Sequence, residues 1–223
     1  LLHCDGSDGS TTFTDSGPDA RTVSRTGSPV ISTTQSKYGG ASASIPGSGN
    51  YLTVPADADF DFGTSDFTIE CWVYTAATNS FCVALSSNSW SSGSGDWALF
   101  TRYDNLDRVV FVYKDDASYL DIRHTTDVHD SAWHHVAIAR SGSTLRLFVD
   151  GVLKTSQTYA GQLGRSDKTT TVGAHPGDSR PFNGYIDDVR ITKGVARYTA
   201  TFTAPTEAFP EGLPPTEVFG LGG

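Results

Sequence analysis

Short segments rich in β-branched and aromatic residues recur along this chain, and turn-forming residues separate them. Nine segments are strand-like: 66–74, 81–86, 97–103, 108–114, 118–124, 133–140, 144–151, 169–174 and 184–192. Gly, Ser, Asn and Asp cluster between these segments, as they do in hairpin turns. Many short strands joined by hairpins predict an all-β fold, an antiparallel two-sheet sandwich with at least ten strands and hardly any helix.

Length and composition allow one large all-β domain or two small ones, since the chain has 223 residues. The apolar fraction is 37%, and 25 aromatic side chains supply the bulk for a core between two sheets. The apolar segments are too short to cross a membrane, so no membrane insertion is expected. The chain begins at Leu1 and contains no methionine, which suggests a processed product or a part of a longer polypeptide.

The net charge is −9, and the acids are 21 Asp against four Glu. Nucleic-acid-binding proteins present basic faces, so this balance argues against nucleic acid as a partner. Asp favours loops, turns and hard cations, whereas Glu favours helices. Glu70 is the only Glu before residue 207.

Three cysteines, Cys4, Cys71 and Cys82, are too few for a disulfide scaffold and match no zinc-binding spacing. Cys71 and Cys82 could face each other across a hairpin centred near residues 76 and 77. We expect two buried free thiols instead.

Alternation along "FTIECWV" assigns its side chains to two faces of a strand. The set predicted to face the core is Phe67, Ile69, Cys71 and Val73. Trp72 and Tyr74 are predicted to point to the opposite face.

Several blocks resemble the laminin-G-like, concanavalin A-like lectin and glucanase jelly-roll domain in order and spacing. They are "LLHCDGSDGSTTFTDSG", "KYGGASASIPGSGNYLTVP", "FDFGTSDFTIECWVY", "WHHVAIARSGSTLRLFVDGV" and "GYIDDVRITKGVARYTATFTAP". The wording of the last block is similar to versions in bacteriophage tail and virion proteins and in bacterial surface proteins. The resemblance covers about residues 1–205 and implies two antiparallel sheets of roughly six or seven strands each.

The resemblance implies a non-catalytic glycan-binding or adhesion module of a virion (tail or capsid decoration) or of a cell surface. The expected partner is a glycan or a cell-surface receptor. The alternative is a purely structural assembly module that binds neighbouring protein subunits, as a homo-oligomer or as part of a larger assembly. Residues 206–223 form a Pro-rich tail, expected to dock on a partner through apolar anchors at Phe209, Leu213, Val218, Phe219 and Leu221.

No enzymatic activity is expected. A glycosidase needs two carboxyl groups, roughly 5–5.5 Å or 6.5–9.5 Å apart, on either side of one sugar bond. The glycosidases that this chain resembles carry a strand of the form E-x-D-x-x-E, which the sequence lacks. No G-x-S-x-G stretch and no Cys/His constellation indicates a nucleophile.

A glycan site is expected on loops at one rim of the sandwich or on its concave face, where aromatic rings stack on sugars and polar groups bind hydroxyls. Three loops, 86–97, 102–107 and 175–184, carry such residues. The candidate ligand-binding residues are Asn88, Trp90, Asp96, Tyr103, Asn105, His175, Arg180, Phe182 and Asn183. Trp90 could instead fold back and cover the sandwich edge.

Asp187 lies within the strand-like stretch "NGYIDDVRITKG", where period two places it on one face with Tyr185, Val189 and Ile191. An ionised carboxyl out of water needs compensation. The resemblance implies a calcium ion at the rim beside the N-terminal strand, with Asp5 and Asp187 as ligands and carbonyls of the Gly39–Gly40 turn. Without metal, Asp187 would cap backbone N–H groups or pair with an arginine, Arg190 or Arg21.

Overall fold

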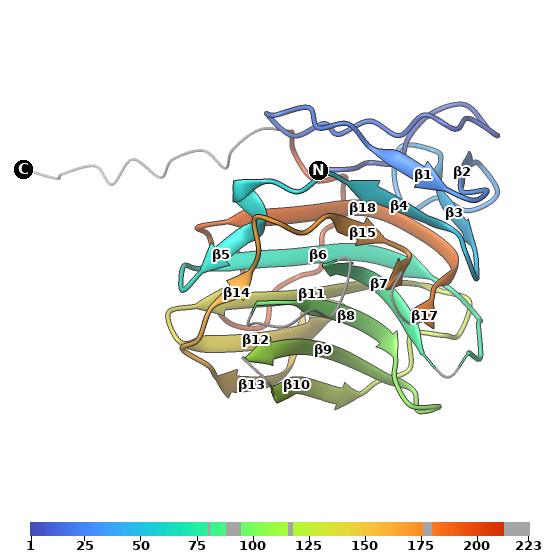
Figure 1. Cartoon of the computed structure of the whole chain (residues 1–223). Helices are drawn as coiled ribbons and strands as arrows, with labels where there is room; N and C mark the ends of the chain where they lie inside the picture. Colours follow the sequence, from blue (N-terminus) through green and yellow to red (C-terminus); the bar gives the residue numbers. More distant parts are fainter. Residues whose placement is uncertain (80, 88–94, 116–117, 176–179, 212–223) are drawn as a thin grey trace, which may run out of the picture.

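The structure is a computed structural model, and it describes residues 1–79, 81–87, 95–115, 118–175 and 180–211. Two large antiparallel sheets pack face to face (Figure 1). Sheet A contains, in spatial order, β1 (Ser24–Thr26), β4 (Tyr51–Val54), β15 (Thr170–Val172), β7 (Cys82–Ser87), β8 (Trp97–Arg102), β9 (Arg108–Asp115) and β10 (Ser118–Thr125). Sheet B contains β13 (Val152–Thr158), β12 (Thr144–Val149), β11 (Trp133–Ser141), β6 (Phe67–Tyr74), β18 (Asn183–Lys193), β3 (Ser42–Pro46) and β2 (Val30–Ser32). The predicted all-β jelly-roll sandwich is confirmed.

The remaining strands form two short sheets of two strands each. One pairs β14 (Leu163–Gly164) with β5 (Asp61–Gly63), and the other pairs β16 (Ala174–His175) with β17 (Arg180–Pro181). In the described ranges the one helix is the 3-10 turn η1 (Ala58–Phe60). None of the described segments forms a helix long and apolar enough to span a membrane.

The core lies between the sheets and follows the predicted alternation of β6. Phe67, Ile69, Cys71 and Val73 belong to the main buried cluster, together with residues from both sheets. Aromatic rings fill the centre of this cluster. Phe62 stacks on Phe67 at 4.6 Å between ring centroids.

The three cysteines are free and buried, which confirms the expectation for Cys71 and Cys82. Burial raises the pKa of the Cys82 thiol to about 12, so it is protonated at neutral pH and packs as an apolar side chain. The cysteines therefore contribute to packing rather than to cross-linking.

A β-bulge in β18 corrects the predicted register of Asp187. The pairing of β18 with β6 shifts between Asp187 and Arg190, and Asp188 has a φ of 48°. The extra residue reverses the faces along the strand. Val189 is in the core, whereas Asp187 pairs with the outward-facing Trp72. Asp187 therefore points away from the core, on the outer face of sheet B.

The segment after β18 packs on this outer face. Tyr198 and Phe202 stack on each other at 3.6 Å, and Phe202 contacts Phe148 of β12 at 5.4 Å. Phe209 is only 3% exposed, and its ring lies 3.7 Å from the guanidinium of Arg190. Phe209 was expected to anchor a partner, and the structure instead buries it inside the chain. The other expected anchors, Leu213, Val218, Phe219 and Leu221, lie outside the described residues.

Candidate functional site

One end of the sandwich gathers most of the predicted ligand-binding residues that the structure describes. At this end β3 finishes and β18 begins, with Asn183 paired to Pro46. β6 finishes here at Tyr74, and β11 begins at Trp133, its pairing partner. Figure 1 shows β17 and the end of β3 at the right-hand edge, opposite β5. We call this end the rim.

A cavity of about 180 Å³ opens on the sheet A side of the rim. Its wall combines the turn between β3 and β4 with the β16–β17 pair. The lining residues are Ser48, Gly49, Tyr51, Ala174, His175, Arg180 and Pro181. A hydroxyl, a phenol, an imidazole and a guanidinium therefore surround one small hollow. This chemistry suits a ligand that carries hydroxyl groups.

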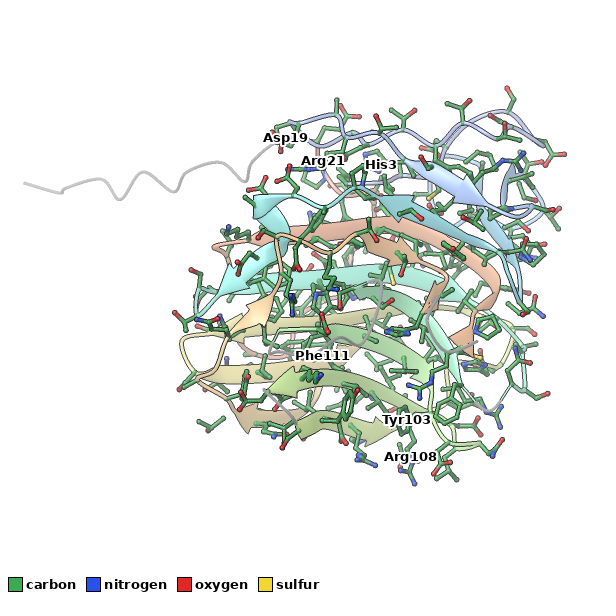
Figure 2. All side chains as sticks on the ribbon, viewed as in Figure 1. His3, Asp19, Arg21, Tyr103, Arg108 and Phe111 are labelled. Carbon is green, nitrogen blue, oxygen red and sulfur yellow. The ribbon has the colours of Figure 1, made fainter. Side chains whose placement is uncertain are left out.

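Arg180 connects the rim cavity to an aromatic cluster at the start of β7 and the end of β8. Its guanidinium lies 4.8 Å from the ring centroid of Phe81 and 5.6 Å from that of Phe100. Tyr103 contacts the same two rings at 5.1 and 5.0 Å. Figure 2 shows Tyr103 at the lower right of the molecule, beside the end of sheet A. Three predicted residues, Tyr103, His175 and Arg180, thus lie at one end of the fold.

Three aromatic side chains form a row on the outer face of sheet B at the same end. Trp133, Tyr74 and Tyr185 come from the adjacent strands β11, β6 and β18 and pair with one another in register. The ring centroids of Tyr74 lie 5.6 Å from Trp133 and 5.9 Å from Tyr185. All three side chains are half-buried, so part of each ring reaches the surface. We call these residues the aromatic row.

Asn183 lies between the aromatic row and the rim cavity. It is exposed and precedes Tyr185 by two residues, so both side chains leave β18 on the same face. A Cβ placed on Gly47, in the turn that also supplies Ser48 and Gly49 to the cavity, would lie 3.7 Å from the Asn183 side chain. The side chain of Asn183 therefore lies between the aromatic row and the turn that lines the rim cavity.

The structure corrects two of the predicted ligand residues. Phe182 has no exposed surface and packs in the main core. Asp96 is also fully buried, with Oδ1 4.0 Å from Nε of Arg165. Alternation explains Phe182, because it neighbours the outward-facing Asn183 and must point inward.

Asn105 is exposed, in the turn between β8 and β9, and its carbonyl accepts a hydrogen bond from Arg102 at 3.4 Å. Trp90 and Asn88 lie outside the described residues. The structure therefore assigns no role to these three residues.

Asp187 is fully buried and accepts three backbone hydrogen bonds. Oδ2 accepts the N–H groups of Lys37 at 2.9 Å and Tyr38 at 3.2 Å, and Oδ1 accepts that of Asp188 at 2.8 Å. Burial raises the pKa of Asp187 to about 7, and the N–H donors act against this rise. The carboxylate caps the 37–38 loop, which was one of the alternatives that the sequence left open.

The backbone N–H groups around Asp187 compete with a calcium ion for its oxygens. Asp5 lies against Gly39, as expected, because a Cβ on Gly39 would collide with its carboxylate. Both oxygens of Asp187, however, already accept N–H groups, whose positive ends repel a cation. Among the residues that the structure describes, no group of three or more His, Cys, Asp or Glu is placed to hold a metal. The calcium site stays a prediction.

Glu70 is the centre of a buried ion-pair network. Its carboxylate accepts hydrogen bonds from Arg190 Nε at 2.8 Å and Tyr198 Oη at 2.8 Å, and lies 3.1 Å from His135 Nε2. Burial favours the neutral acid, but His135 and Arg190 outweigh it and hold the pKa of Glu70 below its ordinary value. Glu70 therefore stabilises the outer face of sheet B and has no access to a substrate.

The fold and the sequence together define the family. The profile of the concanavalin A-like lectin/glucanases superfamily matches residues 46–197, and the chain belongs to this superfamily. No curated protein matches the chain.

Solved structures with the same fold share little sequence with the chain. Domain 4 of AbnA, an extracellular arabinanase from Geobacillus stearothermophilus solved with arabinotriose, aligns with a TM-score of 0.62 and 17% identity, over 79% of this chain and 84% of that one. The binding domain of Paraclostridial Mosquitocidal Protein 1 aligns with a TM-score of 0.67 and 14% identity, over 88% and 49%. The botulinum neurotoxin serotype G binding domain gives 0.62 and 15%, over 82% and 46%. The chain spans about half the length of these two binding domains.

The aromatic row could not be predicted from the sequence, because the bulge in β18 changes the face of Tyr185. Strict alternation assigned Tyr185 to the face of Val189, which is the core. The outward direction of Tyr74 was predicted correctly, and a second signal was present in its partner strand, which begins with Trp133. Only the pairing of three strands brings these rings together.

Proposed function

We propose that the chain is a non-catalytic carbohydrate-binding module and that its ligand lies on the rim. The aromatic row, with the exposed amide of Asn183 beside it, carries this proposal. Sugars present apolar C–H faces that stack on aromatic rings, and their hydroxyls need planar polar groups nearby. The rim supplies both, with the rings on the outer face of sheet B and the amide of Asn183 beside them.

The solved relatives support this proposal by analogy. One is an arabinanase domain in complex with arabinotriose, and the other two are the binding domains of a botulinum neurotoxin and of Paraclostridial Mosquitocidal Protein 1. A shared fold does not transfer function by itself, because function depends on the residues of the site. The analogy gains weight here from the rim, where aromatic and hydroxyl-binding groups meet.

The module binds its ligand without catalysis, and it lies on the outside of a virion or a cell. Glu70, the one Glu before residue 207, is held in a buried network and cannot reach a sugar bond. The module is placed on the surface of a virion or a cell, where it attaches its carrier to a glycan receptor. Resemblance of the "GYIDDVRITKG" block to virion and surface proteins supports this location.

A glycan array with the wild-type chain and two rim variants tests the proposal. Tyr185→Ala removes one ring of the aromatic row, and Asn183→Ala removes the amide. We expect at least one glycan to bind, and each variant to weaken its affinity about tenfold, which corresponds to about 1.4 kcal/mol. Tyr119→Ala is the matched control, since Tyr119 is 57% exposed on β10 and away from the rim.

Two outcomes would contradict this function. A blank array with folded protein would favour the alternative of an assembly module that binds neighbouring subunits. Specific binding that both rim variants retain would confirm a lectin but place its site elsewhere. Thermal melting of each variant separates lost binding from lost folding.

A further inference from the structure

A second cavity lies at the other end of β18 from the rim. Its volume is about 340 Å³, within the range of small-molecule sites. Its lining includes Arg190, Thr192 and Lys193 at the end of β18, Arg197 after it, and Asp19, Arg21 and Asp59 from segments earlier in the chain. We call this cavity the basic pocket, because more basic than acidic side chains line it although the chain carries a net charge of −9.

Most charges of the basic pocket are paired inside the protein. Arg21 forms ion pairs with Asp19 at 2.9 Å and with Asp59 at 2.5 Å. Figure 2 shows Arg21 and Asp19 next to each other at the N-terminal segment, across the molecule from Tyr103. Arg190 pairs with Glu70 at 2.8 Å. Lys193 and Arg197 are engaged less closely: Arg197 approaches Glu70 only to 3.9 Å, and the ammonium of Lys193 donates to a backbone carbonyl.

The two terminal nitrogens of the Arg197 guanidinium are available to bind a ligand. Its Nε donates to Thr192 Oγ1 at 2.9 Å, and Glu70 lies 3.9 Å away, beyond hydrogen-bond distance. Among the described residues, its two terminal nitrogens have no hydrogen-bond partner. Its side chain is only 16% exposed. Arg197 lies partly out of water beside Arg190, and Glu70 at 3.9 Å compensates its charge only at Nε, so an anion at the terminal nitrogens would be stabilised.

Lys193 adds a second donor to the pocket. Within the described part of the chain, its ammonium donates only to the carbonyl of Ala58, at 2.8 Å, which leaves two N–H groups for a ligand. The carboxylates of Asp19 and Asp59 are about half exposed and can accept hydrogen bonds from hydroxyls. The pocket therefore offers donors for one anionic group and acceptors for hydroxyls.

We propose that the basic pocket binds a sugar acid, a small molecule with one carboxylate and several hydroxyls. The carboxylate lies on the fork of Arg197 and beside Lys193, in the bidentate arrangement that guanidinium and carboxylate favour. The hydroxyls face Asp19 and Asp59. This site is separate from the rim, and the inference does not depend on glycan binding there.

Isothermal titration of the whole chain with sodium D-glucuronate at low salt tests the inference. D-glucose is the neutral control, and inorganic phosphate tests whether any anion suffices. We expect glucuronate to bind, and both controls to bind at least about tenfold more weakly. Binding should weaken as salt is added, because the ion pair forms at a partly exposed site.

Two variants locate the binding. Arg197→Ala should weaken glucuronate binding about tenfold or more, because a hydrogen bond to a charged group is lost. Lys193→Ala is the second variant, since Lys193 is exposed, makes no contact with Glu70 and leaves the buried network intact. Tyr185→Ala at the rim should bind glucuronate like the wild type.

Three results would overturn the inference. They are absence of saturable glucuronate binding, equal binding of glucose or phosphate, and unchanged affinity in a folded Lys193→Ala or Arg197→Ala variant. Glucuronate binding that only Tyr185→Ala removes would assign the sugar acid to the rim and also reject the basic pocket. Failure on the glycan array leaves this measurement unaffected, so the two proposals fail separately.

Discussion

The carboxylate of Asp188 accepts the backbone N–H of Phe209 at 2.6 Å, so the bulge in β18 fixes the end of the described chain. The other oxygen of Asp188 lies 2.6 Å from His3 Nδ1. One buried side chain therefore joins β18 to the N-terminal segment and to the C-terminal segment. This geometry requires the left-handed backbone of Asp188, which non-glycine residues adopt at a cost.

Removal of residues 206–223 should destabilise the sandwich. The truncation exposes the surface beneath Phe209 and leaves Asp188 without its N–H donor. Loss of a buried phenylalanine costs about 3–5 kcal/mol. Denaturant unfolding should show this decrease. Removal of residues 212–223 alone is the matched control, because it keeps every described contact of the segment. Equal stability of the two truncated chains would show that Phe209 contributes nothing to the fold.

The sequence predicted which residues of a single strand face the core, but it did not predict how the strands pair. Alternation in β6 predicted which residues form the core, and turn residues predicted the hairpins. The bulge at Asp188 has no comparable signal, because Asp is also common in ordinary turns. A shift by one residue exchanges the two faces of a strand, which explains the wrong face for Tyr185 and Asp187.

The candidate site was predictable only in part, for the same reason. Tyr103, His175, Arg180 and Asn183 share one end of the fold because their loops all connect strands at that end. The aromatic row needs three strands in register, and the basic pocket joins residues as distant in sequence as Asp19 and Arg197. Such contacts depend on sheet order, which local patterns do not encode.

Replacement of Glu70 by glutamine should destabilise the fold strongly. The variant keeps the shape of the side chain but leaves the buried Arg190 guanidinium without its counter-charge. Removing one partner of a buried ion pair costs about 3–5 kcal/mol. Glu207→Gln, at an exposed position, should leave the free energy of unfolding unchanged. If both variants unfold alike, the network is not a determinant of stability.

Replacement of Arg140 by lysine should loosen the loops at the far end of sheet B. Arg140 is fully buried and donates to the carbonyls of Ser65, Gly63 and Gly161 at 2.6–2.9 Å. Lysine cannot match this planar fork. Unsatisfied buried groups cost about 1–3 kcal/mol each, so the melting temperature should fall by several degrees. Arg146→Lys on the neighbouring strand is the control, and an equal effect there would argue against this role.

Asp187 should make the stability of the protein depend on pH between about 4 and 7. Burial raises its pKa in the folded chain to about 7, from 3.8. The folded chain then holds a proton that the unfolded chain has released, so the stabilisation is complete below about pH 4 and is lost as the pH rises through 7. One pKa unit corresponds to about 1.4 kcal/mol. The free energy of unfolding of the wild type, relative to Asp187→Asn, should therefore fall by a few kcal/mol across this range.

The same pair of proteins tests the calcium prediction for Asp5 and Asp187. Capping by the N–H groups of Lys37 and Tyr38 requires no metal, so a chelator should leave the melting temperature of the wild type unchanged. A calcium ion bound only to the folded state would add about 2.7 kcal/mol at a hundred times its dissociation constant, and a chelator would remove this. A chelator effect that Asp187→Asn abolishes would therefore establish the metal and reject the cap.

A pH-independent difference between the two proteins would instead show that the N–H donors outweigh burial and keep the carboxylate ionised, because charged acceptors of backbone hydrogen bonds have lowered pKa values.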